Sequence, residues 1–267
     1  MDRLRAAFQR LRRQHRPALI PFIMGGYPSL AATGPLLVAL QEAGADVVEV
    51  GIPFSDPLAD GPVIQAASAA ALRSGATPER VLRAIAAVRR RLRVPVVCLS
   101  YWNPILQFRA VRGPERFLQA ARASGIDGVI VPDLPVDAGR PWQRAARRAG
   151  VAAVCLAAPT SPPQRLRLIA RASEGFIYYV SVTGTTGVRR RLPEGLLHGI
   201  RQVKLLTTTP VCVGFGISTP AQAAAVTRAA DGVIIGSALL QALGRARGRA
   251  VAARAAAFLR PFRWALR

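Results

Sequence analysis

Acidic side chains are scarce in this sequence, yet three of them fall close together. The chain carries 14 Asp and Glu residues in 267, and Glu49, Asp56 and Asp60 lie within twelve positions. Glu49 stands inside the apolar run 46–52, where an ionised carboxylate is costly unless it is paired. Such a group either has a raised pKa or meets its partner only in the working site. We therefore expect Glu49 and Asp60 to carry acid–base chemistry, and the alternative for Glu49 is a structural ion pair with one of the many Arg residues.

The other common catalytic groups stand in less suitable places. Lys204, the only lysine, falls in a predicted helix, so no Schiff-base nucleophile is visible. His15 and His198 do not follow strand-like runs, so we expect no His-ligated metal. The sequence has no Gly-x-Ser-x-Gly motif and no Cys/His arrangement. Catalysis is left to carboxylates, with Tyr101 or Tyr178 at strand ends as candidate helpers.

Glycine-rich turns follow the last strand-like runs. GFGIS at 214–218 and Gly236-Ser237 each come directly before a predicted helix. Glycine lets backbone N–H groups approach an anion closely, and a helix N-terminus favours negative charge. We interpret the two turns as a phosphate site, with ordinary turn chemistry as the alternative. A third segment, SVTGTTG at 181–187, has the composition of a lid or of an ordinary loop.

These residues need a scaffold, and the sequence supplies a repeated strand–helix pattern. Eight short runs are apolar nearly throughout, as parallel strands covered on both faces are. They fall at 18–24, 46–52, 94–100, 128–133, 151–157, 175–181, 210–216 and 231–237. Helical segments follow, among them 29–43, 78–92, 114–124, 139–149, 162–173, 194–206, 219–229 and 237–247. The pattern predicts an α/β fold, a closed (β/α)8 TIM barrel whose active site is built by the loops after the strands; a doubly wound sheet is the alternative.

The pattern predicts one barrel domain over 1–267, with an extra N-terminal helix at 1–17 and a C-terminal helical extension at 248–267. No apolar run reaches the roughly 18 residues that span a bilayer, and the N-terminus lacks the apolar region of a secretory signal. The cysteines at 98, 155 and 212 lie singly in apolar runs. This predicts buried thiols in a reducing compartment, and we expect a cytoplasmic protein without membrane contact.

The formal net charge of +23 invites the hypothesis of a nucleic-acid-binding protein. The basic residues argue against it, because they are scattered over nearly every predicted helix and no aromatic side chains are interleaved with them for base stacking. We expect no nucleic-acid partner, although a basic surface could attract an anionic substrate.

Several segments resemble one enzyme family. They are VEVGIPFSDPLADGPVIQ at 48–65, PFIMGGYP at 21–28, SYWNPI at 100–105, VPDLP at 131–135, YVSVTGTTG at 179–187, VGFGIS at 213–218 and IGSAL at 235–239. In this order they resemble the tryptophan synthase α subunit, over residues 1 to about 245. The resemblance implies a lyase of tryptophan biosynthesis that cleaves indole-3-glycerol phosphate into indole and glyceraldehyde 3-phosphate by a retro-aldol reaction without a cofactor or metal. It also implies an αββα heterotetramer in which the β subunit carries pyridoxal phosphate and joins indole to serine.

The resemblance also assigns roles to single residues. Glu49 becomes the proton-transfer residue, Asp60 the acceptor of the indole N–H, and Tyr178 a tyrosine close to Glu49. The indole pocket would contain Phe22, Leu99 and Ile130, each of which could equally be plain core. The lid threonine would be Thr186, and the phosphate-binding positions Gly187, Gly216, Gly236 and Ser237. The positions facing the β subunit would be Pro53, Asp56, Asn103, Asp133 and Pro135.

Three positions depart from the family pattern: Val63 stands where Thr is expected, Trp102 where Tyr is frequent, and Val182 where some members have Arg. They bear on lid closure and on coupling to the β subunit rather than on the carboxylates. Three alternatives stay open at this point. They are a stand-alone lyase that releases free indole, a non-catalytic phosphate-binding barrel subunit, and another phosphate-handling barrel enzyme.

Overall fold

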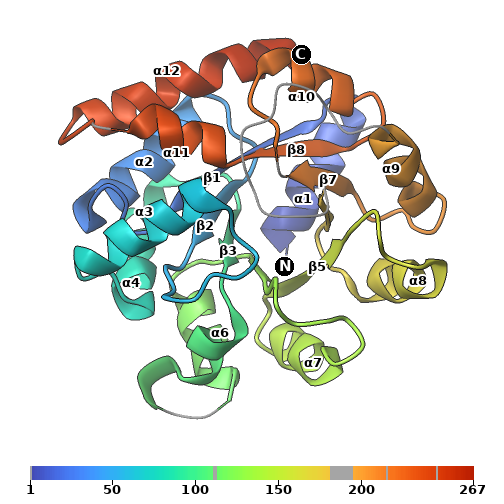
Figure 1. The fold of residues 1–267 in the computed structure, drawn as a ribbon, viewed down its shortest axis with the longest axis horizontal. Coiled ribbons are helices and arrows are strands. Elements are labelled where there is room, and N and C mark those ends of the chain that lie inside the picture. Colours follow the sequence, from blue (N-terminus) through green and yellow to red (C-terminus); the bar gives the residue numbers. More distant parts are fainter. Residues whose placement is uncertain (1, 111–112, 181–194, 215, 245) are drawn as a thin grey trace.

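A computed structural model describes residues 2–110, 113–180, 195–214, 216–244 and 246–267. Eight parallel strands form a closed barrel in chain order, because β8 pairs with β1 as well as with β7 (Figure 1). The strands are β1 (Ala18–Met24), β2 (Val48–Gly51), β3 (Val96–Leu99), β4 (Gly128–Ile130), β5 (Ala152–Ala157), β6 (Ile177–Val180), β7 (Val211–Gly214) and β8 (Gly232–Ile235). The predicted TIM barrel is confirmed, and the doubly wound sheet is excluded.

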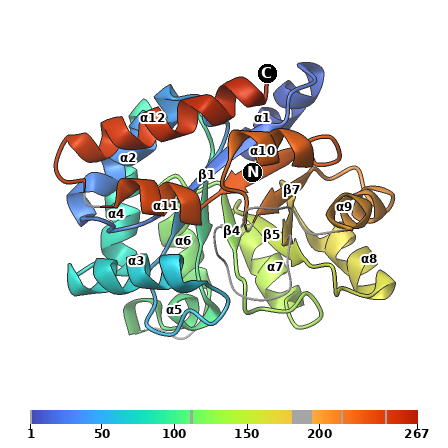
Figure 2. The ribbon, with the colours of Figure 1, turned by 45° about the horizontal axis from the view of Figure 1, so that its top comes forward.

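The helices form an outer layer around the strands (Figure 2). They are α1 (Asp2–Arg13), α2 (Leu30–Glu42), α3 (Pro62–Arg73), α4 (Pro78–Val88), α5 (Trp102–Leu106), α6 (Glu115–Ala123), α7 (Arg140–Arg148), α8 (Pro163–Ala172), α9 (Leu196–Lys204), α10 (Pro220–Val226), α11 (Ser237–Leu243) and α12 (Ala250–Ala265). Most lie where the sequence predicts them. Two helices were not among the predicted segments: α3, whose first residue is Pro62, and the short α5.

The strand register explains why the apolar runs are apolar throughout. Side chains of successive residues point alternately into the barrel and toward the helices, and both environments exclude water. Phe22 on β1 is paired with Glu49 on β2. Two residues after Glu49 on β2, Gly51 is paired with Leu99 on β3, which is paired in turn with Ile130 on β4. Residues two apart on a strand share a face, so these five positions line one side of the sheet near the carboxyl ends of the strands.

Three aspartates join neighbouring strands at the amino ends of the barrel strands. They are Asp46, Asp127 and Asp231, and we call them the aspartate locks. Each stands just before a strand and accepts a hydrogen bond from the first or second residue of the preceding odd-numbered strand. The backbone donors are Leu19 to Asp46 (3.0 Å), Val96 to Asp127 (3.0 Å) and Val211 to Asp231 (2.8 Å). Each carboxylate also meets a cation: Arg263 at 2.7 Å, Arg89 at 3.4 Å and Lys204 at 2.7 Å, in the same order.

Helix α1 lies across the amino ends of the strands and covers this end of the barrel. Leu4 is fully buried, and a Cβ built on Gly175 would lie 2.3 Å from its side chain. The Phe8 ring packs on Phe176, with 5.7 Å between ring centroids. The apolar face of α1 therefore closes the barrel on the side away from the loops that follow the strands, and the predicted N-terminal helix is confirmed.

Candidate active site

Glu49 is the most unusually placed charged side chain of the described chain. It lies on β2, is 1% exposed, and neither carboxylate oxygen has a hydrogen-bond partner within the described residues. No ion pair joins it to a described Arg, so the structural alternative finds no support there. Burial raises its pKa to about 8, and the nearby charge of Asp60 adds to the effect. A carboxyl group with such a pKa holds a proton at neutral pH and can release it.

Asp60 lies in the loop between β2 and α3 and is 6% exposed. Burial raises its pKa to about 6, and the hydrogen bond from the Tyr101 hydroxyl opposes that rise. The same Tyr101 oxygen accepts the backbone N–H of Ala59 at 2.9 Å. Gln65 on α3 donates to the Asp60 backbone carbonyl at 2.8 Å. Asp60 is therefore held from two sides, by the end of β3 and by the first turn of α3.

The rest of this loop is fixed by one residue of α3. The Ser68 hydroxyl accepts the Phe54 N–H at 2.9 Å and donates to the Phe54 carbonyl at 2.9 Å. The Phe54 ring also packs on Tyr101, with 5.4 Å between centroids. These side-chain contacts with α3 and with the end of β3 hold the loop in place, in addition to its prolines, whose φ is fixed.

Tyr178 lies on β6 with its hydroxyl over the backbone of β7. A Cβ built on Gly214 would stand 2.3 Å from that hydroxyl oxygen, so a glycine is needed at this position. Burial raises the Tyr178 pKa well above its ordinary value, and the negative charges of Glu49 and Asp60 add to the effect. Tyr178 therefore keeps its proton near the two carboxyl groups. No pattern in the sequence indicates that Gly214 serves this contact rather than the neighbouring turn.

The three residues proposed for an indole pocket are brought together by the sheet register. Phe22 is 4% exposed, Leu99 8% and Ile130 fully buried. The Phe22 ring passes over Gly51, where a Cβ would lie 2.8 Å from Cζ, and beside Gly236, where a Cβ would lie 3.3 Å from Cδ1. Glycine at both positions leaves room for the ring inside the barrel.

The turns predicted to hold phosphate are partly described. Gly216 follows β7 with φ of +81°, a left-handed conformation that glycine adopts without strain. Gly236 follows β8 and Ser237 opens α11. Thr186 and Gly187, proposed for the lid and the phosphate site, lie outside the described residues.

The positions proposed to face a partner differ in exposure. Asp56, Asn103, Asp133 and Pro135 are exposed, whereas Pro53 is buried. Asp133 also has a structural role. Its carboxylate accepts a hydrogen bond from the Trp102 N–H at 2.9 Å and so caps the N-terminus of α5.

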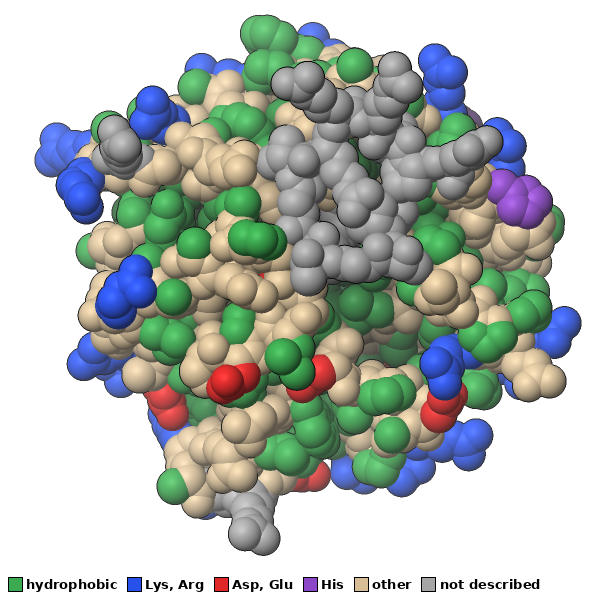
Figure 3. Space-filling view, in the orientation of Figure 1, with side chains coloured by type: hydrophobic (Ala, Val, Ile, Leu, Met, Phe, Trp, Pro, Cys, Tyr) green, Lys and Arg blue, Asp and Glu red, His purple; other side chains and the backbone are tan. Residues whose placement is uncertain are grey.

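A further residue of this surface has no signal in the sequence. Leu58, in the loop before Asp60, is 87% exposed. On the face of the molecule shown in Figure 3, hydrophobic side chains occupy much of the middle and Lys and Arg lie mostly toward the rim. On this face, the described basic residues do not gather into a stripe.

Within the described residues no group of three or more His, Cys, Asp or Glu side chains could hold a metal ion. None of the helices in the described ranges is long and apolar enough to cross a membrane.

A closed barrel with two buried carboxyl groups and glycine-rich turns at the carboxyl ends of its strands defines a barrel enzyme of the acid–base class. The sequence model of the tryptophan synthase alpha chain matches residues 8–265. The alpha chain of Geobacter sulfurreducens is 45% identical over 245 residues (92% of this chain, 91% of that protein), and that of Carboxydothermus hydrogenoformans is 47% identical over 241 (90% and 89%).

Solved structures agree with the sequence comparison. Tryptophan synthase subunit alpha from Legionella pneumophila superposes with a TM-score of 0.90 at 35% identity, covering 100% of this chain and 98% of that one. A tryptophan synthase chain from Mycobacterium tuberculosis gives 0.90 at 36% identity (99% and 98%). The chain belongs to the tryptophan synthase alpha chain family. It is a lyase of tryptophan biosynthesis, and its reaction is the cleavage of indole-3-glycerol phosphate to indole and glyceraldehyde 3-phosphate.

Proposed function

We propose that Glu49 and Asp60 divide the chemistry of this cleavage between them. The observation that carries the proposal is the pair of buried carboxyl groups with different pKa values, about 8 for Glu49 and about 6 for Asp60. Between these two values Glu49 is protonated and Asp60 is ionised. Carboxyl groups whose environments separate their pKa values in this way take opposite roles as acid and base.

Glu49 gives its proton to C3 of the indole ring. The bond from that carbon to the glycerol chain then breaks, and its electrons return to the ring. The glycerol hydroxyl becomes the aldehyde of glyceraldehyde 3-phosphate, and its proton passes to the Glu49 carboxylate. Glu49 thus ends the cycle protonated, as it began. The absence of a hydrogen-bond partner on its oxygens within the described residues leaves them free for both transfers.

Asp60 accepts the indole N–H and stabilises the positive charge that protonation places on the ring. Tyr101 acts as a positioning residue, because its hydroxyl binds the Asp60 carboxylate and the Ala59 backbone at once. Tyr178 supplies a neutral hydroxyl close to Glu49. Phe22, Leu99 and Ile130 enclose the indole ring, which also excludes water from the carboxyl groups.

The phosphate end of the substrate lies at the turns after β6, β7 and β8. Gly216, Gly236 and Ser237 would offer backbone N–H groups and a hydroxyl there, with Gly187 completing the site, and Thr186 would belong to the lid. The reaction needs no cofactor or metal in this chain, since protonation of the ring supplies the electron sink.

A β subunit is the proposed partner, in an αββα heterotetramer in which pyridoxal phosphate belongs to β. The solved structures similar to this chain include an aminoacrylate-bound form of tryptophan synthase from M. tuberculosis. The exposed Leu58, in the loop between Asp56 and Asp60, would be covered by the β subunit. We propose a cytoplasmic enzyme that uses no nucleic acid.

Indole release from indole-3-glycerol phosphate tests these assignments. We would compare the wild type with Glu49→Gln and Asp60→Asn, each with and without a β subunit. Loss of activity in both variants, with retained folding and faster turnover of the wild type with β, supports the proposal. Turnover that β leaves unchanged would instead favour a stand-alone lyase. A fully active Glu49→Gln would overturn the role of Glu49.

A further inference from the structure

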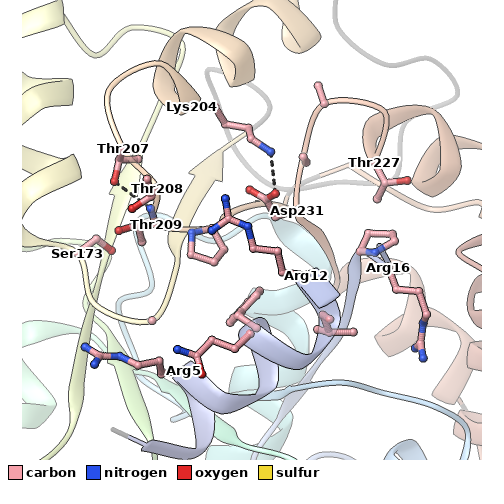
Figure 4. Close-up of a pocket in the computed structure, with 18 of the residues that line it drawn as sticks. Arg5, Arg12, Arg16, Ser173, Lys204, Thr207, Thr208, Thr209, Thr227 and Asp231 are labelled. Carbon is pink, nitrogen blue, oxygen red and sulfur yellow. Dashed lines mark hydrogen bonds and ion pairs between the residues drawn. The ribbon is translucent and has the colours of Figure 1, made fainter. Parts of the chain in front are cut away.

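A cleft lies at the end of the barrel opposite the carboxyl groups. It has a volume of about 890 Å³ and opens between α1 and the segments 173–175, 204–210 and 227–231 (Figure 4). These segments precede β6, β7 and β8, whereas the active site is built from loops that follow the strands. The cleft is therefore separate from the site that cleaves the substrate.

The cleft is rich in positive charge. The cationic residues that line it are Arg5, Arg12, Arg16, Lys204 and Arg228, and the acidic ones are Glu174 and Asp231. Asp231 is fully engaged, with Lys204 at 2.7 Å and the Val211 N–H at 2.8 Å. Glu174 pairs with Arg147 at 2.8 Å through Oε1, and its Oε2 has no hydrogen-bond partner among the described residues. The cations of the lining therefore outnumber its carboxylates five to two.

Three of the five cations have no acidic partner among the described side chains. Arg16 meets the Asp46 lock at 3.4 Å, and Lys204 is paired as above, but Arg5, Arg12 and Arg228 form no described ion pair. Unpaired guanidinium groups around one hollow raise its potential and favour an anion inside it. The attraction between a guanidinium group and an anion is also stronger in a cleft than on the open surface, because the effective dielectric constant is lower there.

The arrangement of these groups sets the shape of the anion. Arg5 and Arg12 are seven residues apart on α1, which places them on one stripe of the helix with about 10 Å between them along its axis. Thr207, Thr208 and Thr209 lie on the wall opposite α1, near Arg12, whereas Arg5 lies further along the helix at the edge of the cleft (Figure 4). Guanidinium forks and hydroxyl groups are the side chains that recognise phosphate oxygens.

We propose that this cleft binds a small oligophosphate anion, a molecule with two or more phosphate groups spaced to meet Arg5 and Arg12 together. A single phosphate would reach one guanidinium and leave the other unpaired. The lining has two residues with rings, Phe8, which is buried against the barrel, and His15, which is exposed. The five cationic side chains make phosphate groups the part of the ligand that the cleft recognises.

Calorimetric titration of the full chain with inorganic triphosphate tests the proposal, with orthophosphate as the short probe. The test variant is Arg5→Gln with Arg12→Gln. The matched control is Arg73→Gln with Arg83→Gln, which removes the same charge from exposed positions outside the cleft. We expect one triphosphate site, unchanged in the control and weakened about tenfold for each cleft guanidinium removed. Backbone amide NMR signals of Thr207–Thr209 should shift on titration, while circular dichroism of the variants stays unchanged.

Three results would overturn the oligophosphate site, and one more would refute the way it is recognised. Equal weakening in both double variants would show general attraction to a highly basic surface, and it would overturn the proposal. So would the lack of saturable binding, or amide shifts that spread over the surface without including Thr207–Thr209. Tighter binding of orthophosphate than of triphosphate would refute the two-point recognition by Arg5 and Arg12.

Discussion

Replacing Glu49 by Gln should make this enzyme more stable at alkaline pH while it removes activity. The folded pKa of about 8 lies above the ordinary 4.5, so the unfolded chain loses this proton first as pH rises. The protonated Glu49 contributes its full stabilisation below pH 4.5, the ordinary pKa. As the pH rises from there to about 8, the folded pKa, the free energy of unfolding falls and this contribution is lost. At 1.36 kcal/mol per pKa unit the total is about 5 kcal/mol. The variant keeps a neutral group of similar size and escapes this loss.

Urea unfolding of both proteins at pH 5, 7 and 9 measures the effect. At pH 5 the two should differ little, and at pH 9 the variant should be more stable by several kcal/mol. Asp60→Asn is the control, with a smaller gain because its carboxyl pKa rises only to about 6. A difference between wild type and Glu49→Gln that stays constant from pH 5 to pH 9 would refute a buried, uncompensated Glu49. Direct titration of the labelled Glu49 carboxyl carbon by NMR would then give an ordinary pKa.

The remaining predictions concern activity and packing. The kcat/KM for cleavage should rise through about pH 6 and fall through about pH 8, the pKa values of the two carboxyl groups; a flat profile would contradict their roles. Tyr101→Phe should lower kcat about tenfold and move the acid limb to higher pH, because Asp60 loses a hydrogen bond that lowers its pKa. Gly214→Ala should cost about 1–3 kcal/mol through its clash with Tyr178, measured by urea unfolding, and Tyr178→Phe should relieve part of this cost. Asp127→Ala should cost about 3 kcal/mol, since Arg89 loses its buried partner, and leave kcat unchanged.

The strands and the acid pair could be predicted because each leaves a local signal. A parallel strand covered on both faces is apolar at every position, and a glutamate inside such a run is conspicuous. Helix α3 was not anticipated, since its alanine-rich sequence carries one basic residue, Arg73, and begins directly after a loop rich in proline and glycine. Its amphipathic pattern is weak, so only the barrel around it shows which face is buried.

Other features depend on register and could not be predicted. The hydrogen bond between Ala59 and Tyr101 joins residues 42 positions apart in the sequence, and it exists only because β3 lies beside β2. Likewise, the sequence shows Asp127 without showing that its carboxylate meets the Val96 N–H. Asp133 was predicted to face a partner, and its role at the start of α5 requires the neighbouring strand end to be in place.

The position of α1 has a consequence for the nascent chain. The apolar face of α1 contacts segments from the middle of the sequence, and Phe8 can pack only after Phe176 has been synthesised, 168 residues later. At about 5–20 residues per second, that interval lasts roughly ten to thirty seconds on the ribosome. Throughout it, Leu4, Phe8 and Leu11 have no barrel to cover them. The first helix to be made is thus among the last to be buried, and its apolar face is the surface on which a ribosome-associated chaperone would act.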